Sequence, residues 1–279
     1  MALSSGRPEL SIGLIDGPID LTHPAFADSK IKTVNNFQYD RCMSADSISC
    51  THGTFIAGIL CAKRGLSAPA ICPSCTIVLF PLFSESTKDK SNLLPFSTPA
   101  DLSNAIIETI EAGARIINLS IGLLSSSSSK IPELEEVYEY ARDKGVIIIA
   151  SAGNQGNVGF FPLINNKWII PVAACDSQGR PMTKSNFGPS IGKQGVMAPG
   201  MNIISTLPGG RYGQMSGTSV AAPFVSGTIA LLYSLFPKAT PEELIYAVVR
   251  GLDCNRRSIV PPLLNADAAI RMLKEMHHL

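Results

Sequence analysis

Short runs of consecutive apolar residues recur along the 279-residue chain, separated by longer segments with the apolar spacing of helices. The short runs have the length of strands that are buried on both faces, as in a parallel sheet. They are residues 10–15, 77–83, 115–119, 146–150 and 168–173. Helices are expected between or after these strands, at residues 99–112, 132–144 and 219–235. This alternation predicts an α/β fold in which helices cover both faces of a parallel sheet.

A later helix is indicated by residues 240–243, where a threonine precedes a proline and two glutamates. Proline at the first helical position and a carboxylate near the third are common at helix starts. No linker or internal repeat interrupts the pattern, and 45% of the residues are hydrophobic. We therefore expect residues 1–279 to form a single domain, with the serine run 125–129 as a surface loop.

Ser219 is the candidate nucleophile, because it lies among small residues at the start of an apolar helix, in the segment Gly217-Thr218-Ser219-Val220-Ala221-Ala222-Pro223. Gly217 allows a tight turn, and Thr218 is the expected N-cap. Pro223 should be tolerated because few N–H groups near a helix start have an internal partner. A hydroxyl at this place lies beside the positive helix end, where a developing oxyanion is stabilised.

A serine nucleophile needs a base, and the chain has only four histidines. His277 and His278 lie in the last three residues, where chain ends fray. His23 precedes a proline, which favours a turn or an extended segment, and we interpret it as structural. His52 follows Thr51, which can cap a helix that begins at the histidine. We predict that His52 is the general base.

Two further candidates follow predicted strands, where functional groups of α/β sheets gather. Asp16 ends the apolar run 10–15 and can orient the histidine; Asp20 is the weaker alternative and could instead cap a turn. Asn154 follows the run 146–150 between glycines and can donate to an oxyanion. An isolated asparagine in such a turn is more often a turn residue, but the other groups favour the catalytic interpretation.

These segments resemble those of the subtilisin family of serine proteases, in the same order. The matching blocks are Ile15-Asp16-Gly17, His52-Gly53-Thr54, Ser151-Ala152-Gly153-Asn154 and Gly217–Pro223. The resemblance implies that Ser219 is the nucleophile, His52 the base and then the acid, and Asp16 the orienting carboxylate. It also implies that Asn154 is the oxyanion donor, and that the fold is a three-layer α/β/α sandwich with a mainly parallel central sheet.

The same resemblance suggests where a peptide substrate binds. Residues 119–123 resemble the edge that accepts the peptide as an additional strand, with backbone bonds from Ser120 and Gly122 and with Leu123 in place of a common glycine. Ser151, Ala152 and Gly153 would form the facing wall of the first pocket. A plain solvent loop is the alternative for the serine run that follows.

Two departures from the secreted family members change the expectations. Residues 61–70 replace their calcium-binding loop without any carboxylate or asparagine, and Lys63 and Arg64 would repel a cation. We therefore expect no calcium there, and neither a metal nor another cofactor in catalysis. Val220 stands where many relatives have an oxidisable methionine, so peroxide should inactivate the enzyme less readily.

The seven cysteines leave several possibilities open. Cys42 and Cys50 could pair, as could Cys72 and Cys75, and the two pairs together could in principle hold zinc. The remaining cysteines lie in settings typical of inert thiols. They are Cys61, Cys175 and Cys254.

A finer resemblance concerns the subtilisin-like proteases of cyanobactin biosynthesis, which mature ribosomally made precursor peptides. It depends on residues 71–75 and on the short loop without calcium ligands. It also depends on our expectation that the long folding propeptide of secreted subtilisins is absent, because only fifteen residues precede Asp16. One type removes the leader by hydrolysis, and the other forms rings and carries a helical insertion between the aspartate and the histidine. Asp16 and His52 are separated here by what we interpret as only a loop, which favours the leader-side hydrolase. A ring-forming transpeptidase, a general intracellular protease and an inactive binding module remain alternatives.

The net charge, the length of the apolar runs and the N-terminal residues indicate which kinds of binding partner the chain can have. A net charge of +1 without a basic cluster argues against nucleic acid. We find no apolar run of the length that spans a membrane, and no signal-peptide core at the N-terminus. We expect a cytoplasmic enzyme whose partner is its peptide substrate. The alternative is a catalytic domain cut from a longer protein.

Overall fold

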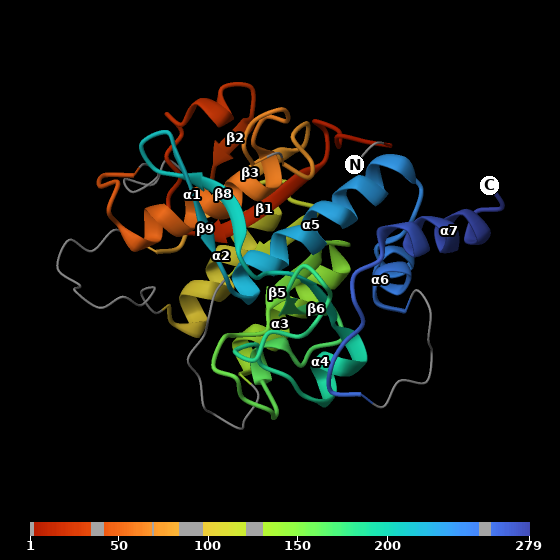
Figure 1. Ribbon diagram of the computed structural model, residues 1–279. Coiled ribbons are helices and arrows are strands. Elements are labelled where there is room, and N and C mark those ends of the chain that lie inside the picture. The colour runs from red at the N-terminus through yellow and green to blue at the C-terminus, as the bar shows by residue number, and fades with distance from the viewer. Residues whose placement is uncertain (1–2, 35–41, 69, 84–96, 121–130, 251–257) are drawn as a thin grey trace.

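The fold is built around a seven-stranded sheet in the order β2-β3-β1-β4-β5-β6-β7, in which every neighbouring pair is parallel. Figure 1 shows how the strands lie among the helices. The computed structural model describes residues 3–34, 42–68, 70–83, 97–120, 131–250 and 258–279. The sheet strands are β1 (Ser11–Asp16), β2 (Lys30–Thr33), β3 (Thr76–Pro81), β4 (Ile116–Leu119), β5 (Ile147–Ser151), β6 (Ile169–Cys175) and β7 (Val196–Pro199).

The other elements are an antiparallel hairpin, seven helices within the described ranges, and two short 3-10 turns. The hairpin joins β8 (Ile203–Leu207) to β9 (Arg211–Met215). The helices are α1 (Ile48–Cys61), α2 (Pro99–Glu111), α3 (Pro132–Asp143), α4 (Pro189–Gln194), α5 (Thr218–Leu235), α6 (Pro241–Arg250) and α7 (Ala266–Met276). The 3-10 turns are η1 (Pro24–Phe26) and η2 (Pro162–Ile164).

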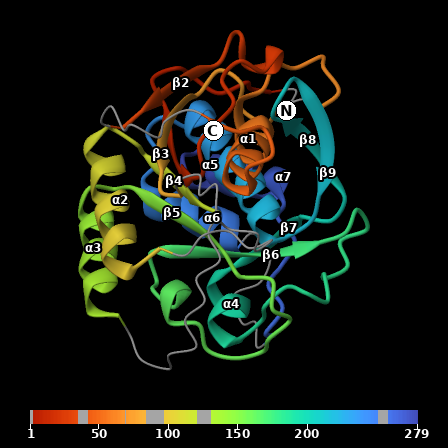
Figure 2. The same cartoon turned by 90° about the vertical axis from the view of Figure 1, so that its left-hand side faces the viewer.

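Helices cover both faces of the sheet, and the predicted three-layer α/β/α arrangement is confirmed (Figure 2). Ile147 and Ile149 of β5 pack in the core that contains α1, α5, α6 and α7. Ile148, between them, packs in the opposite core with α2 and α3. Successive residues of a strand point to opposite faces, so a run of isoleucines buried on both sides is what this sandwich requires.

α5 is the central helix of the first layer, and it is more apolar than we expected of any segment. Among the described residues it is long and apolar enough, by length and composition, to span a membrane, although we expected no such run. In this fold 78% of it is buried against the sheet and its neighbouring helices. Its apolar character on every side is therefore explained by burial in a core.

Because the strands are parallel, their carboxyl ends lie at one edge of the sheet, together with the polar residues found there. Ile15 pairs with Leu119, and Leu119 pairs with Ala150, so the residues that follow lie side by side. These residues are Asp16, Ser120 and Ser151. α5 begins at the same edge, because residues 217–218 contact the loop that follows β5.

Candidate active site

Asp16, His52 and Ser219 form a hydrogen-bonded chain at this edge. The Nδ1 atom of His52 lies 2.7 Å from Oδ1 of Asp16, and its Nε2 atom lies 3.0 Å from the Ser219 hydroxyl oxygen. Because an ionised carboxylate can only accept, Nδ1 donates to Asp16, which leaves Nε2 to accept from Ser219. Asp16 is fully buried, His52 is 8% exposed and Ser219 is half-buried, so the nucleophile is the member that solvent reaches.

His52 is positioned by α1, but the helix does not start where we expected. It begins at Ile48, and the Ser47 hydroxyl accepts from the Cys50 N–H at 3.3 Å, so Ser47 and not Thr51 is the N-cap. The histidine therefore lies inside the helix. Gly53 allows α1 to lie close to the turn that follows β1, because a Cβ atom there would come within 2.5 Å of the Pro18 carbonyl oxygen.

Asp16 is fixed by the end of β1. Its Oδ1 atom also accepts from the Gly17 N–H at 2.7 Å, and its own carbonyl accepts from the Leu82 N–H at 2.8 Å. The carboxylate is thus held in one orientation toward His52 from a buried strand. This is the geometry in which an aspartate selects the histidine tautomer and stabilises the imidazolium.

Asn154 lies beside the nucleophile, and its orientation follows from its contacts. Its Oδ1 atom accepts from the Thr218 N–H at 2.8 Å, so the Nδ2 group is the end left to donate. A Cβ atom on Gly217 would lie 3.2 Å from that Nδ2 and 3.5 Å from the Ser219 hydroxyl oxygen. The amide donor and the nucleophile therefore flank the same small space, as an oxyanion site requires.

The start of α5 corrects two local expectations. Gly217 is the N-cap without a side-chain bond, and Thr218 is already helical. The Thr218 hydroxyl accepts instead from the Gly153 N–H at 3.1 Å, which ties α5 to the loop after β5. Pro223 lies inside the helix, beyond the residues whose N–H groups lack an internal acceptor. The helix start therefore does not explain why the proline is tolerated.

The alternatives to the triad residues lie elsewhere. His23 is 2% exposed; its Nδ1 accepts from the Ala25 N–H at 3.0 Å and its Nε2 donates to the Arg211 carbonyl at 2.9 Å. Asp20 accepts from the Thr22 N–H at 3.0 Å and from the Gly209 N–H at 2.8 Å. Both side chains are therefore occupied in holding turns.

The residues expected to bind the peptide are described only in part. Ser120, Ser151, Ala152 and Gly153 lie at the active-site edge, whereas Gly122 and Leu123 fall outside the described residues. The backbone of the expected wall is anchored from behind, because Ala152 donates to Val172 at 2.9 Å and accepts from the Asn186 amide at 3.0 Å. Its role in the first pocket stays a prediction.

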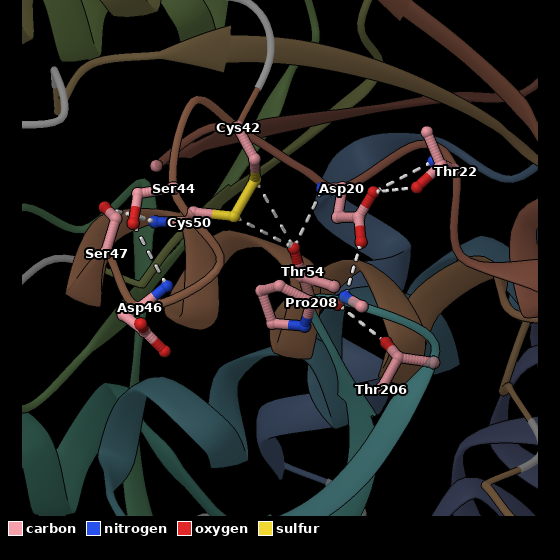
Figure 3. The surroundings of a disulfide bond; sticks show 12 residues. Asp20, Thr22, Cys42, Ser44, Asp46, Ser47, Cys50, Thr54, Thr206 and Pro208 are labelled. Atoms are coloured by element: carbon pink, nitrogen blue, oxygen red, sulfur yellow. Dashed lines mark hydrogen bonds between the residues drawn. A yellow bond between two sulfur atoms is a disulfide. The ribbon is translucent and has the colours of Figure 1, made fainter.

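Of the possible cysteine pairings, Cys42–Cys50 forms a disulfide that packs over Thr54 of α1 (Figure 3). Cys72, Cys75 and Cys175 are buried free thiols. Burial also raises the pKa of the Cys61 thiol to about 12, which makes it unreactive at neutral pH. Over the described ranges no group of three or more His, Cys, Asp or Glu side chains could hold a metal, and Cys254 lies outside them.

Sequence comparison gives close relatives among proteases. A thermophilic serine proteinase of Bacillus sp. (strain AK1) is 32% identical over 235 residues, which cover 83% of this chain and 54% of that protein. Subtilisin E of Bacillus subtilis (strain 168) is 30% identical over 240 residues, 84% of this chain and 58% of that protein. The chain thus spans little more than half the length of these relatives.

Solved structures that share the fold cover nearly the whole chain. A mutant of the protease domain of PatA superposes with a TM-score of 0.88 at 30% identity, covering 99% of both chains. The prenylagaramide maturation protease PagA gives 0.84 at 30% identity, over 98% of this chain and 96% of that one. The PatG macrocyclase in complex with peptide also gives 0.84, over 98% and 93%, but at 19% identity it shows the shared fold alone.

The family assignment comes from the sequence as a whole. Residues 7–259 match the family described as the subtilase family, which includes every segment that builds the site. That match agrees with the parallel sheet and with the order of Asp16, His52 and Ser219 along the chain. The chain belongs to the subtilase family.

Proposed function

We propose that the chain is a serine endopeptidase that removes the leader from a ribosomally made precursor peptide of the cyanobactin type. The observation that carries the catalytic part is the 3.0 Å contact between the Ser219 hydroxyl and His52, with Asp16 behind it at 2.7 Å. The similarity to PatA and PagA, at 30% identity over nearly the whole of both chains, supports the precursor peptide as substrate.

The reaction follows from the positions of these atoms. His52 takes the Ser219 hydroxyl proton as the oxygen bonds to the scissile carbonyl carbon. The carbonyl oxygen becomes an oxyanion, to which Asn154 Nδ2 and the Ser219 N–H donate. The C–N bond then breaks, and His52 gives its proton to the leaving amine. In the second half a water molecule gives a proton to His52 as its oxygen bonds to the acyl carbon. The ester bond to Ser219 then breaks, and His52 returns the proton to the Ser219 oxygen, which releases the carboxylic acid product and restores the enzyme.

Hydrolysis is favoured over ring formation by the segment between Asp16 and α1. This segment is not only a loop, as we expected, because it contains η1 and the edge strand β2. Residues 35–41 are not described, and the described part of the segment contains no α-helix before α1. A ring forms only where water is kept from the acyl-enzyme, so the lack of an α-helix in the described part of this segment supports hydrolysis.

The cytoplasm remains our proposal for the location of the chain. The Cys42–Cys50 disulfide is unusual for a reducing compartment, so its state in the cell tests this proposal. Alkylation of thiols in intact cells before lysis should label both cysteines if the chain resides in the cytoplasm. Protection of both cysteines would point to an oxidising compartment.

Mass spectrometry of a cyanobactin-type precursor incubated with the protein tests the proposed function. We expect a linear leader and a linear core, and neither product with the Ser219→Ala variant. A core lighter by one water would mean that the acyl-enzyme is captured by an amine and would refute hydrolysis. If the precursor stays intact while an unrelated peptide is cleaved, the protein is a protease but the precursor is not its substrate.

A further inference from the structure

The backbone carbonyl of Ser219 lacks its normal helical partner. In an α-helix the carbonyl of one residue accepts from the N–H four residues later. Four residues after Ser219 stands Pro223, which has no N–H and whose ring crowds that same carbonyl. The helix therefore cannot hold the backbone carbonyl of Ser219, the residue with the nucleophilic hydroxyl, through its usual hydrogen bond.

Ser120 supplies the missing donor from the sheet. It follows β4, is 1% exposed, and its hydroxyl donates to the Ser219 carbonyl oxygen at 3.0 Å. The same hydroxyl oxygen accepts from the Asn118 amide at 2.7 Å. A serine hydroxyl has a single proton, so accepting from Asn118 leaves that proton directed at Ser219.

The amide of Asn118 is itself held by α5. Asn118 is fully buried in β4, and its Oδ1 accepts from the Ser226 hydroxyl at 2.8 Å. The chain of hydrogen bonds thus starts on α5 at Ser226, crosses β4 and returns to α5 at Ser219. Buried polar groups that are all satisfied in this way impose a single arrangement on their neighbours.

We propose that Ser120 is a positioning residue for the nucleophile, acting as a substitute for the helical N–H that Pro223 removes. Holding the Ser219 carbonyl fixes the backbone from which both the attacking hydroxyl and one oxyanion N–H project. Errors near 1 Å in such groups can cost about 10²-fold in rate, so a weak hydrogen bond at this place has catalytic consequences. The inference needs only the triad chemistry and not the identity of the substrate.

The first test compares Ser120→Ala with the wild-type enzyme on any peptide that the enzyme cleaves. We expect kcat to fall by about 10- to 100-fold with KM little changed, because positioning of the nucleophile matters in the transition state. Ser234→Ala is the matched control: Ser234 lies on the same helix, is 4% exposed, and donates to the Ala230 carbonyl at 2.8 Å. It should keep the wild-type kcat. A Ser120→Ala enzyme with wild-type kcat would overturn the proposal.

The second test is rescue by restoring the helical donor. Pro223→Ala returns an N–H to the place from which the Ser219 carbonyl should accept. In the Ser120→Ala background we expect it to recover most of the lost kcat, with circular dichroism establishing that each variant is folded. A purely structural loss at Ser120 predicts no recovery, since the cavity and the unpaired Asn118 amide remain. If the double variant Ser120→Ala with Pro223→Ala is folded and its kcat does not recover, the proposal that the Ser120 hydroxyl replaces the helical N–H is refuted.

Discussion

Arg64 offers a sharp test of how the loop that follows α1 is stabilised, at the place where the sequence predicts no calcium. Its guanidinium donates to the carbonyls of Ser4, Ala70 and Ile71 at 3.2, 3.1 and 2.5 Å, and to the Ser5 hydroxyl at 2.8 Å. The guanidinium thus connects the N-terminal segment to the loop that follows α1 through hydrogen bonds to oxygens of both. We predict that Arg64→Met is destabilised because these oxygens lose their shared donor.

The expected size of the effect follows from this contact set. Hydrogen bonds from a charged donor contribute about 1.5–3 kcal/mol each when buried, and neutral ones about 0.5–1.5 kcal/mol. Arg64 is half-buried, so we take about 0.5–1 kcal/mol for each bond, the lower part of the neutral range, which gives about 2–4 kcal/mol for the set of four. For a chain of this size each kcal/mol lowers Tm by about 2–4 °C. The expected loss is therefore about 5–15 °C.

The assay is thermal unfolding in the Ser219→Ala background, which prevents self-digestion, with calcium and with EDTA. We expect the protein with Arg64 intact to have the same Tm with calcium as with EDTA. We also expect that calcium does not change the Tm of Arg64→Met. Arg180→Met is the control, because Arg180 is exposed and pairs with Asp176 at 2.7 Å on the surface. The reasoning fails if Arg64→Met unfolds no earlier than this control, or if EDTA lowers the Tm of the parent protein.

Three shorter predictions concern the site and its surroundings. Asn154→Ala should lose about 10²–10³-fold in kcat with KM nearly constant; an unchanged kcat would remove Asn154 from the oxyanion site. Hydrogen peroxide should inactivate the Val220→Met variant faster than the native enzyme, because only the variant has an oxidisable side chain beside Ser219; equal rates would show that this position is irrelevant. Reducing Cys42–Cys50, which closes a separation of eight residues, should cost about 2–3 kcal/mol of stability, seen as a lower Tm with dithiothreitol in the Ser219→Ala background. An unchanged Tm would mean that the loop is held by other contacts.

The sequence allowed the sheet and the site to be predicted for the same physical reason. Strands buried on both faces must be continuously apolar, so the runs that contain Ile12 and Ile148 are visible without any structure. Polar residues that end such runs have few structural explanations, which singled out Asp16 and Asn154. Edge strand β2 was missed because Lys30-Ile31-Lys32-Thr33 alternates in exposure and is too short for its pattern to stand out.

What could not be predicted depends on contacts between distant segments. The starts of α1 and α5 were placed wrongly. Ser47 and Thr51 can both cap a helix, and the structure uses Ser47. Thr218 is inside α5 because its hydroxyl accepts from the distant Gly153 N–H and its own N–H donates to Asn154. The sequence analysis used Arg64 only as a charge that would repel a cation. Its hydrogen bonds to the Ala70 and Ile71 carbonyls were not predicted. Asn118, a polar residue inside the run 115–119, was a visible signal that was not used.

The central claim is that Ser219, activated by His52, is the nucleophile. Mass spectrometry of the protein after treatment with a fluorophosphonate, which reacts with activated serines, tests this claim most directly. We predict a single adduct on the peptide that contains Ser219, with His52→Ala labelled far more slowly. Labelling at another residue, or full labelling without His52, would contradict the account.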